Sequence, residues 1–250
     1  MNKKELKNFL DFKAEEYENP NFIERDPVSI PHKFSRREDI EIAGLLSATI
    51  AWGNRKSILT NAAKMMAIME HSPYDFVCSY KQDDFRKLSG FVHRTFNADD
   101  LDFFIRALQN IYLHKKGLEN AFQGNNAKAA IANFREEMLA VEHLPRSEKH
   151  LSNPDKNSAA KRLNMYLRWM VRPAAKGVDF GLWKTLSPAV LSCPLDVHSG
   201  NVARKLGLLK RKANDWKAVD ELDLSLQKLD ALDPVKYDFA LFGMGVNEKF

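Results

Sequence analysis

Apolar side chains recur along nearly the whole chain at the spacing of an α-helix, whereas the alternation typical of β-strands is hard to find. In the segment from Ile42 to Ile50, the positions expected to face inward follow the series i, i+3, i+4, i+7 and i+8. The later stripes are Leu101, Phe104, Ile105 and Leu108; Leu163, Tyr166, Leu167 and Met170; and Leu222, Leu226 and Leu229. Because each stripe must be buried against a neighbour, the sequence predicts an all-α fold, arranged as an orthogonal multi-helix bundle.

Helix-breaking residues divide this pattern into separate elements. Asp233-Pro234 combines an N-cap with a first-turn proline and predicts a helix that Gly243 and Gly245 end. Residues 123–126 are expected to separate two helices, and the polar, proline-containing stretch 143–157 to form a long connection.

Three prolines predict irregular structure between Glu18 and Ser35. We expect residues 1–250 to form a single functional unit with two helical subdomains, one of about 36–142 and the other of about 150–250 together with the N-terminal helix.

Composition places the chain among ordinary folded proteins, with 44% apolar and 28% charged residues in a total of 250. It has no apolar run of roughly 20 residues, and its N-terminus is of mixed charge, so we expect a cytoplasmic, non-membrane protein. Cys78 and Cys193 are too few for a disulfide framework or a four-cysteine site, so no metal or cofactor is expected. The net charge of +5 is compatible with a polyanionic partner, although many basic proteins bind no nucleic acid.

The segment from Cys193 to Gly207 is the most informative stretch for function. Pro194 favours an extended backbone before it, Asp196 lies where an N-cap belongs, and Gly207 ends the helix. The pattern therefore predicts a carboxylate held at a helix N-terminus. On spacing alone, this aspartate could be a helix cap and nothing more.

This segment resembles the Pro-x-Asp-x-His motif of helix-hairpin-helix DNA glycosylases, which an arginine and a Leu-Gly helix end follow. The matching residues are Pro194, Asp196, His198, Arg204, Leu206 and Gly207. The resemblance implies the helical glycosylase fold with an interhelical cleft, and a catalytic role for Asp196. From the residues alone, a structural first-turn histidine is the favoured interpretation of His198, and a solvated charge that of Arg204.

Residues 158–172 resemble the lysine-bearing helix of the archaeal 8-oxoguanine glycosylase branch, where the nucleophilic lysine lies a little over thirty residues before the aspartate. Here the separation is 196 − 161 = 35, which makes Lys161 the candidate nucleophile. Lys156, in the preceding loop, is the second candidate. Helical geometry groups Lys161, Met165, Arg168 and Arg172 on one face. That face could contact DNA or be a solvated basic surface.

A third match, Leu45 to Thr49, resembles the Leu-Leu-Ser-Ala-Gln helix of endonuclease-III-type members. In that family the following loop, here residues 51–55, probes the gap left by the extruded base. Trp52 is alternatively a packed aromatic beside a helix-breaking glycine. The residues expected at the base pocket or duplex probe are Trp52, Asn54, Met165 and Trp169. Those expected to bind DNA are Arg55, Lys156, Arg168, Arg172, His198 and Arg204.

Together these resemblances imply a monomeric, nucleoid-associated DNA glycosylase that removes an oxidised base, with 8-oxoguanine first, through a lysine Schiff base that can also cleave the strand. The partner is damaged duplex DNA, and the base must be extruded to be reached. The usual Leu-Pro-Gly-x-Gly hairpin is absent, and residues 151–157 stand near its place. The alternatives are therefore a non-catalytic nucleic-acid-binding protein with the same fold, or a protein-interaction scaffold. The chain is also similar to a bacterial family described only as a domain of unknown function, through Arg168 to Arg172 and Tyr237 to Gly243.

Overall fold

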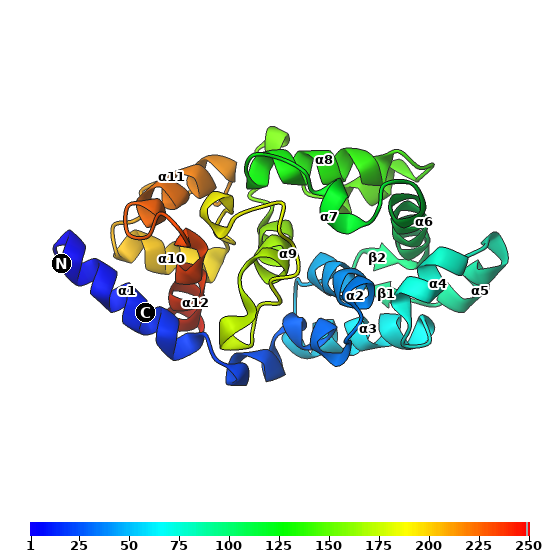
Figure 1. Ribbon diagram of the computed structural model, residues 1–250, viewed down its shortest axis with the longest axis horizontal. Helices are drawn as coiled ribbons and strands as arrows, with labels where there is room; N and C mark the ends of the chain where they lie inside the picture. The colour runs from blue at the N-terminus through cyan, green and yellow to red at the C-terminus, as the bar shows by residue number, and fades with distance from the viewer. Residues whose placement is uncertain (249) are drawn as a thin grey trace. The chain divides into compact units, whose positions relative to one another are not determined.

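The computed structural model describes residues 1–248 and 250, and it is mostly helical (Figure 1). The prediction of an all-α protein is confirmed at this level. The chain folds into two compact units. The terminal unit contains Met1–Phe22, Asn125–Lys128 and Asn153–Phe250, and the central unit contains Ile23–Gly124 and Ala129–Ser152.

The central unit contains seven helices in the part of the chain that the structure describes. They are α2 (Arg37–Thr49), α3 (Arg55–Ile68), α4 (Pro73–Ser79), α5 (Phe85–Leu88), α6 (Ala98–His114), α7 (Leu118–Ala121) and most of α8 (Ala127–Leu139). Two of them, α2 and α6, carry predicted apolar stripes. Short 3₁₀ turns occupy much of the proline-containing stretch before α2, in agreement with the irregular structure predicted there. The sequence did not indicate the two-residue antiparallel strands β1 (Val92–His93) and β2 (Phe96–Asn97).

A buried carboxylate joins α6 to the connection that follows α8. Asp100 accepts hydrogen bonds from the Ser147 hydroxyl (2.6 Å) and Arg146 (3.1 Å) and lies 3.3 Å from Nε2 of His150. Burial raises the pKa of Asp100, but His150, Ser147 and the Asn97 amide outweigh it and lower the pKa to about 2. The part of this connection from Arg146 to His150 is therefore fixed by polar contacts although it lacks long helices.

The terminal unit contains α1 (Lys3–Tyr17), α9 (Lys161–Val171), α10 (Val197–Lys205), α11 (Trp216–Gln227) and α12 (Tyr237–Gly243). In Figure 1, α1 runs beside α12, so the first and last helices pack together. A Cβ atom at Gly243 would lie 2.3 Å from the ring of Tyr17. Glycine at this position therefore permits the close approach of the two helices.

The end of the last helix differs from the prediction. Gly243 ends α12 as expected, but Gly245 does not stop the helical path, which continues as a π-helical turn from Met244 to Glu248. Throughout the part of the chain that the structure describes, every helix is too short or too polar to cross a bilayer.

Candidate active site

The helix that carries Lys161 starts from an unusual backbone conformation. Ala160, the residue before it, is buried and has a φ of +45°, in the left-handed region that costs an L-residue roughly 1–2 kcal/mol. The preceding loop is held by Asn157, whose carbonyl accepts a hydrogen bond from the Trp216 amide (3.2 Å) and whose side chain donates to Asp215 (3.0 Å). These bonds tie the loop to the start of α11 and fix the position of Lys161.

Asp196 is the N-cap of α10, as the sequence predicts. Its Oδ1 accepts a hydrogen bond from the Ser199 amide (3.0 Å), and the Ser199 hydroxyl accepts one from the Asp196 amide (3.0 Å). This reciprocal capping box satisfies two backbone donors and restricts the rotation of the carboxylate. The other oxygen, Oδ2, remains available for a different partner.

That partner is Lys161, whose Nζ lies 2.9 Å from Oδ2 of Asp196. The two side chains are 31% and 17% exposed, so solvent reaches both. Burial raises the pKa of Asp196, but the Lys161 ammonium group and the Ser199 amide outweigh burial and leave the pKa below its ordinary value. The carboxylate is therefore ionised at neutral pH, and two residues 35 positions apart in the chain meet as an ion pair.

Phe242 of α12 forms one wall beside this pair. Its ring centroid lies 5.8 Å from Nζ of Lys161 and 6.3 Å from the ring centroid of His198. His198 is exposed in the first turn of α10. A Cβ atom at Gly245 would lie 3.0 Å from both Cβ and O of His198, so glycine lets the C-terminal turn pack on α10. Three helices and the last turn thus contribute to one site.

Arg168 and Arg172, which we expected on a DNA-facing surface, are only 2% and 5% exposed. Arg168 Nη1 donates to Asp238 (2.7 Å), and Arg172 Nη1 donates to Glu18 (2.7 Å) and Asp179 (2.5 Å). Buried carboxylates therefore occupy both guanidinium groups. We correct the expected role of these two arginines from DNA contact to stabilisation of the terminal unit.

Two other residues of α9 are also in the core. Met165 and Trp169 are buried, Trp169 completely, so the expected contact of Trp169 with an extruded base is corrected to core packing. Arg204 donates from Nε to the carbonyl of Arg211 (2.8 Å) and from Nη2 to that of Lys212 (2.9 Å), which gives it a role in holding the loop after α10. Lys156, by contrast, is exposed.

The predicted duplex probe lies in the central unit. Trp52 is half-buried, stacks on His150 with ring centroids 5.8 Å apart, and meets His93 edge to face at 5.1 Å. Asn54 and Arg55 are exposed, and the side chain of Asn54 caps α3. Trp52 is thus a packed aromatic, and a role of the exposed loop beside it in probing DNA stays a prediction.

Two acidic residues that contact Cys193 were not singled out from the sequence. Asp238 of α12 lies 4.0 Å from Sγ of Cys193, and the Cys193 amide donates to Asp223 of α11 (2.9 Å). Burial raises the pKa of Asp223 to about 7 and that of the Cys193 thiol well above its ordinary range. In the sequence the two aspartates are ordinary acidic residues of amphipathic helices, so no motif could have identified them.

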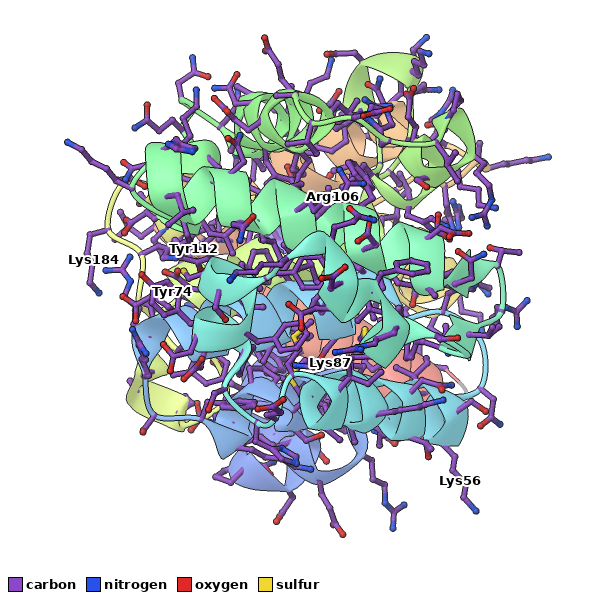
Figure 2. All side chains as sticks on the ribbon, turned by 90° about the vertical axis from the view of Figure 1, so that its right-hand side faces the viewer. Lys56, Tyr74, Lys87, Arg106, Tyr112 and Lys184 are labelled. Carbon is purple, nitrogen blue, oxygen red and sulfur yellow. The ribbon has the colours of Figure 1, made fainter. Side chains whose placement is uncertain are left out.

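A hollow of about 380 Å³ in the central unit is a weaker candidate. Tyr74 and Tyr112 lie side by side there (Figure 2), edge to face with centroids 5.2 Å apart. Glu41 accepts hydrogen bonds from the Tyr112 hydroxyl (2.8 Å) and from Arg37 (2.9 Å), so these polar groups satisfy one another. Among residues 1–248 and 250, no group of three or more His, Cys, Asp or Glu side chains is arranged to hold a metal ion.

Comparisons with known proteins correct the family assignment. Residues 26–247 match the family described as "Protein of unknown function (DUF2400)". No curated protein and no solved structure matches the chain. Membership of the helix-hairpin-helix glycosylase superfamily, which the sequence motifs imply, is therefore wrong, because the match over most of the chain is to an uncharacterised family. The chain belongs to this family, DUF2400.

Proposed function

We propose that this protein is a DNA glycosylase with an associated strand-cleaving activity, in which Lys161 is the nucleophile and Asp196 the essential carboxylate. The observation that carries the proposal is the 2.9 Å contact between two solvent-accessible groups, an amine and a carboxylate, at the starts of two helices. Many exposed ion pairs have no function and contribute at most about 1 kcal/mol. Two features distinguish this pair from them.

Both features are unfavourable for stability and both occur at Lys161. The first is the left-handed backbone of Ala160, a strained conformation of the kind that collects at functional sites. The second is the placement of a lysine in the first turn of α9, next to the positive end of the helix dipole, where a cation is unfavourable for helix stability. A purely structural surface lysine would need neither, whereas a nucleophilic amine needs a fixed position and access to its neutral form.

In the proposed reaction, Lys161 loses a proton and attacks the anomeric carbon of a damaged nucleotide. A new C–N bond forms while the glycosidic bond breaks, and the electron pair of the broken bond leaves with the base, which takes up a proton. Opening of the sugar ring gives a Schiff base with Lys161, from which β-elimination of the 3′ phosphate cuts the strand. Asp196, ionised and fixed by its cap, stabilises the positive charge on the sugar and relays the proton.

The substrate in this proposal is a damaged base in duplex DNA, extruded from the stack to reach the amine. The reaction requires a groove at Lys161 wide enough for one nucleotide and positive charge around it for the phosphates. Exposed Lys156, five residues before Lys161, and exposed His198, two residues after Asp196, are candidates for phosphate contact. An oxidised base such as 8-oxoguanine is the first lesion to test.

Borohydride trapping tests the proposal because it reduces a Schiff base to a stable amine. The full chain is incubated with labelled duplexes that contain 8-oxoguanine, thymine glycol, uracil, hypoxanthine or an abasic site, with and without borohydride. We expect a covalent protein–DNA adduct with the abasic duplex and with at least one damaged base. Lys161→Ala should abolish the adduct, since no amine remains at the site.

Lys156→Ala is the matched control, because this exposed lysine lies five residues away in the preceding loop. It should retain the adduct at saturating protein concentration, because loss of one phosphate contact weakens binding but leaves the nucleophile in place. If the wild-type protein releases no base and forms no adduct with any of the duplexes, the enzymatic proposal is overturned. Binding without chemistry would then leave a non-catalytic nucleic-acid-binding protein.

A further inference from the structure

We propose that Asp238 is a positioning residue of the Lys161–Asp196 site, which aligns α9 with α12 and adds a second carboxyl group to the electrostatic surroundings of the amine. The catalytic role that this inference gives to Asp238 depends on the proposed function. Its geometric basis is independent of any reaction.

Two contacts connect α9 with α12, at different heights of the same interface. Arg168 lies seven residues after Lys161, which is two turns along the same face of α9, and Phe242 lies one turn after Asp238 on α12. Lys161 faces the ring of Phe242 at 5.8 Å, and Arg168 donates to Asp238 at 2.7 Å. The Arg168–Asp238 ion pair therefore sets the register in which Phe242 meets Lys161.

Asp238 also contacts the segment that leads to Asp196. Its Oδ1 lies 4.0 Å from the thiol of Cys193, three residues before Asp196, and the Cys193 amide is held by Asp223. One buried carboxyl group thus touches both chain segments that supply the pair. Asp238 itself is 6% exposed, so substrate does not reach it and its influence must be indirect.

The charged groups around Asp238 come from three parts of the terminal unit. Arg168 and Lys161 face it from α9, Asp196 and the Cys193 thiol from the segment before α10, and Asp179 from the loop after α9. Burial raises the pKa of Asp238 to about 6, although Arg168 opposes this effect. Below that pH the group is neutral, and above it the group adds a negative charge that favours the ammonium form of Lys161.

Replacement of Asp238 by asparagine keeps an oxygen acceptor for Arg168 and removes the charge at every pH. The Lys161 amine should then become available at lower pH. We expect the acid limb of the pH profile for borohydride trapping to move down by about one pH unit in Asp238→Asn, which is about tenfold in rate on that limb. A purely structural role would lower stability without moving the profile.

Asp233→Asn is the matched control. Asp233 is half-buried and also pairs with an arginine of the terminal unit, but its Oδ2 lies 2.9 Å from Nη2 of Arg172, not beside Arg168. This variant removes an equal charge and should keep the wild-type profile. Equal profiles for the wild type and both variants would overturn the role of Asp238.

A second measurement does not depend on DNA. The rate of Lys161 acetylation by a small acylating reagent is followed against pH by mass spectrometry, in the wild type and both variants. The pH profile of the acetylation rate should move to lower pH in Asp238→Asn, as the trapping profile does, and stay unchanged in Asp233→Asn. If the wild type forms no DNA adduct, the glycosylase proposal fails while the acetylation profile still decides the role of Asp238.

The wild-type protein provides a check if Asp238→Asn does not fold. Its acetylation rate should deviate near pH 6 from the curve of a single titrating amine, because ionisation of Asp238 changes the charge around Lys161. A simple one-proton curve between pH 5 and 9 would overturn the inference.

Discussion

The two carboxylate oxygens of Asp196 have different partners and different roles. Oδ1 caps α10 through the Ser199 amide, whereas Oδ2 lies against the Lys161 amine. The cap contributes to folding and the second oxygen to the proposed chemistry. Because asparagine is as good an N-cap as aspartate, substitution at this position can separate the two tasks.

Asp196→Asn should fold with little loss of stability and lose most of its activity. The amide oxygen still caps α10, but the charge that stabilises the sugar and relays the proton is gone, so we expect base release to fall by about 10²–10⁴-fold. Asp196→Ala should in addition lose roughly 1 kcal/mol of stability, about 2–4 °C in Tm. Single-turnover assays and thermal melts measure the two effects. Wild-type rates in Asp196→Asn would mean that the carboxylate is only a helix cap.

At the scale of residues, the sequence predicted the members of the ion pair but not the buried charges behind them. Asp196 could be found because it lies in an N-cap pattern, and Lys161 because residues 158–172 resemble the lysine-bearing helix of the archaeal glycosylase branch. Arg168 looks like a solvated charge because its partner, Asp238, lies 70 residues further along the chain. Helical periodicity describes one helix and cannot show which distant carboxylate will neutralise an arginine on it.

Helix α9 starts from a strained backbone conformation, and a different residue at that position would make the helix more stable. Its first residue follows Ala160, whose left-handed backbone a glycine would adopt without steric cost. Among the described residues, no side chain caps the start of this helix either. The strain is compensated by the loop contacts of Asn157 and by burial of nearly the whole helix.

Ala160→Gly should therefore stabilise the protein by roughly 0.5–1 kcal/mol, because it removes the strain of the left-handed conformation. Ala159→Gly is the control: its φ is not positive, so it should destabilise by a similar amount through added freedom of the unfolded chain. Urea denaturation of both variants gives the comparison. Equal destabilisation by the two glycines would show that Ala160 carries no strain.

At the scale of elements, regular apolar spacing predicted α2, α6, α9 and α11, and the N-cap Asp196 located the start of α10. The strands β1 and β2 escaped prediction because two residues are too few to show an alternation. The π-helical turn after Gly243 also could not be foreseen. It depends on the packing of Gly245 against His198, a tertiary contact that the local sequence does not encode.

The whole molecule carries a net charge of +5, which on its own favours any polyanion. In the proposed function this charge acts through contacts between lysines or arginines and phosphates. Such contacts release counterions, so binding must weaken as salt is added.

We expect the Kd for undamaged duplex, measured by fluorescence anisotropy, to rise at least about tenfold between 50 and 200 mM NaCl. Lys156→Ala should make the slope of log affinity against log salt shallower by about one unit, as loss of a single phosphate contact does. If the Kd for duplex DNA does not change with salt, or if the protein does not bind DNA, the result would favour a protein-interaction scaffold.

The terminal unit is assembled from three separate stretches, and α1 packs on the last helix. Glu18 meets Arg172 across 154 positions, and Tyr17 bonds Glu248 across 231. On the ribosome the central unit, residues 23–124 and 129–152, emerges complete while α1 still lacks its partner, so it is able to fold first. The wall that Phe242 forms beside Lys161 arises only once α12 has been synthesised. Once residue 152 has emerged, the nascent chain therefore carries a complete central unit while the amine site is still unassembled.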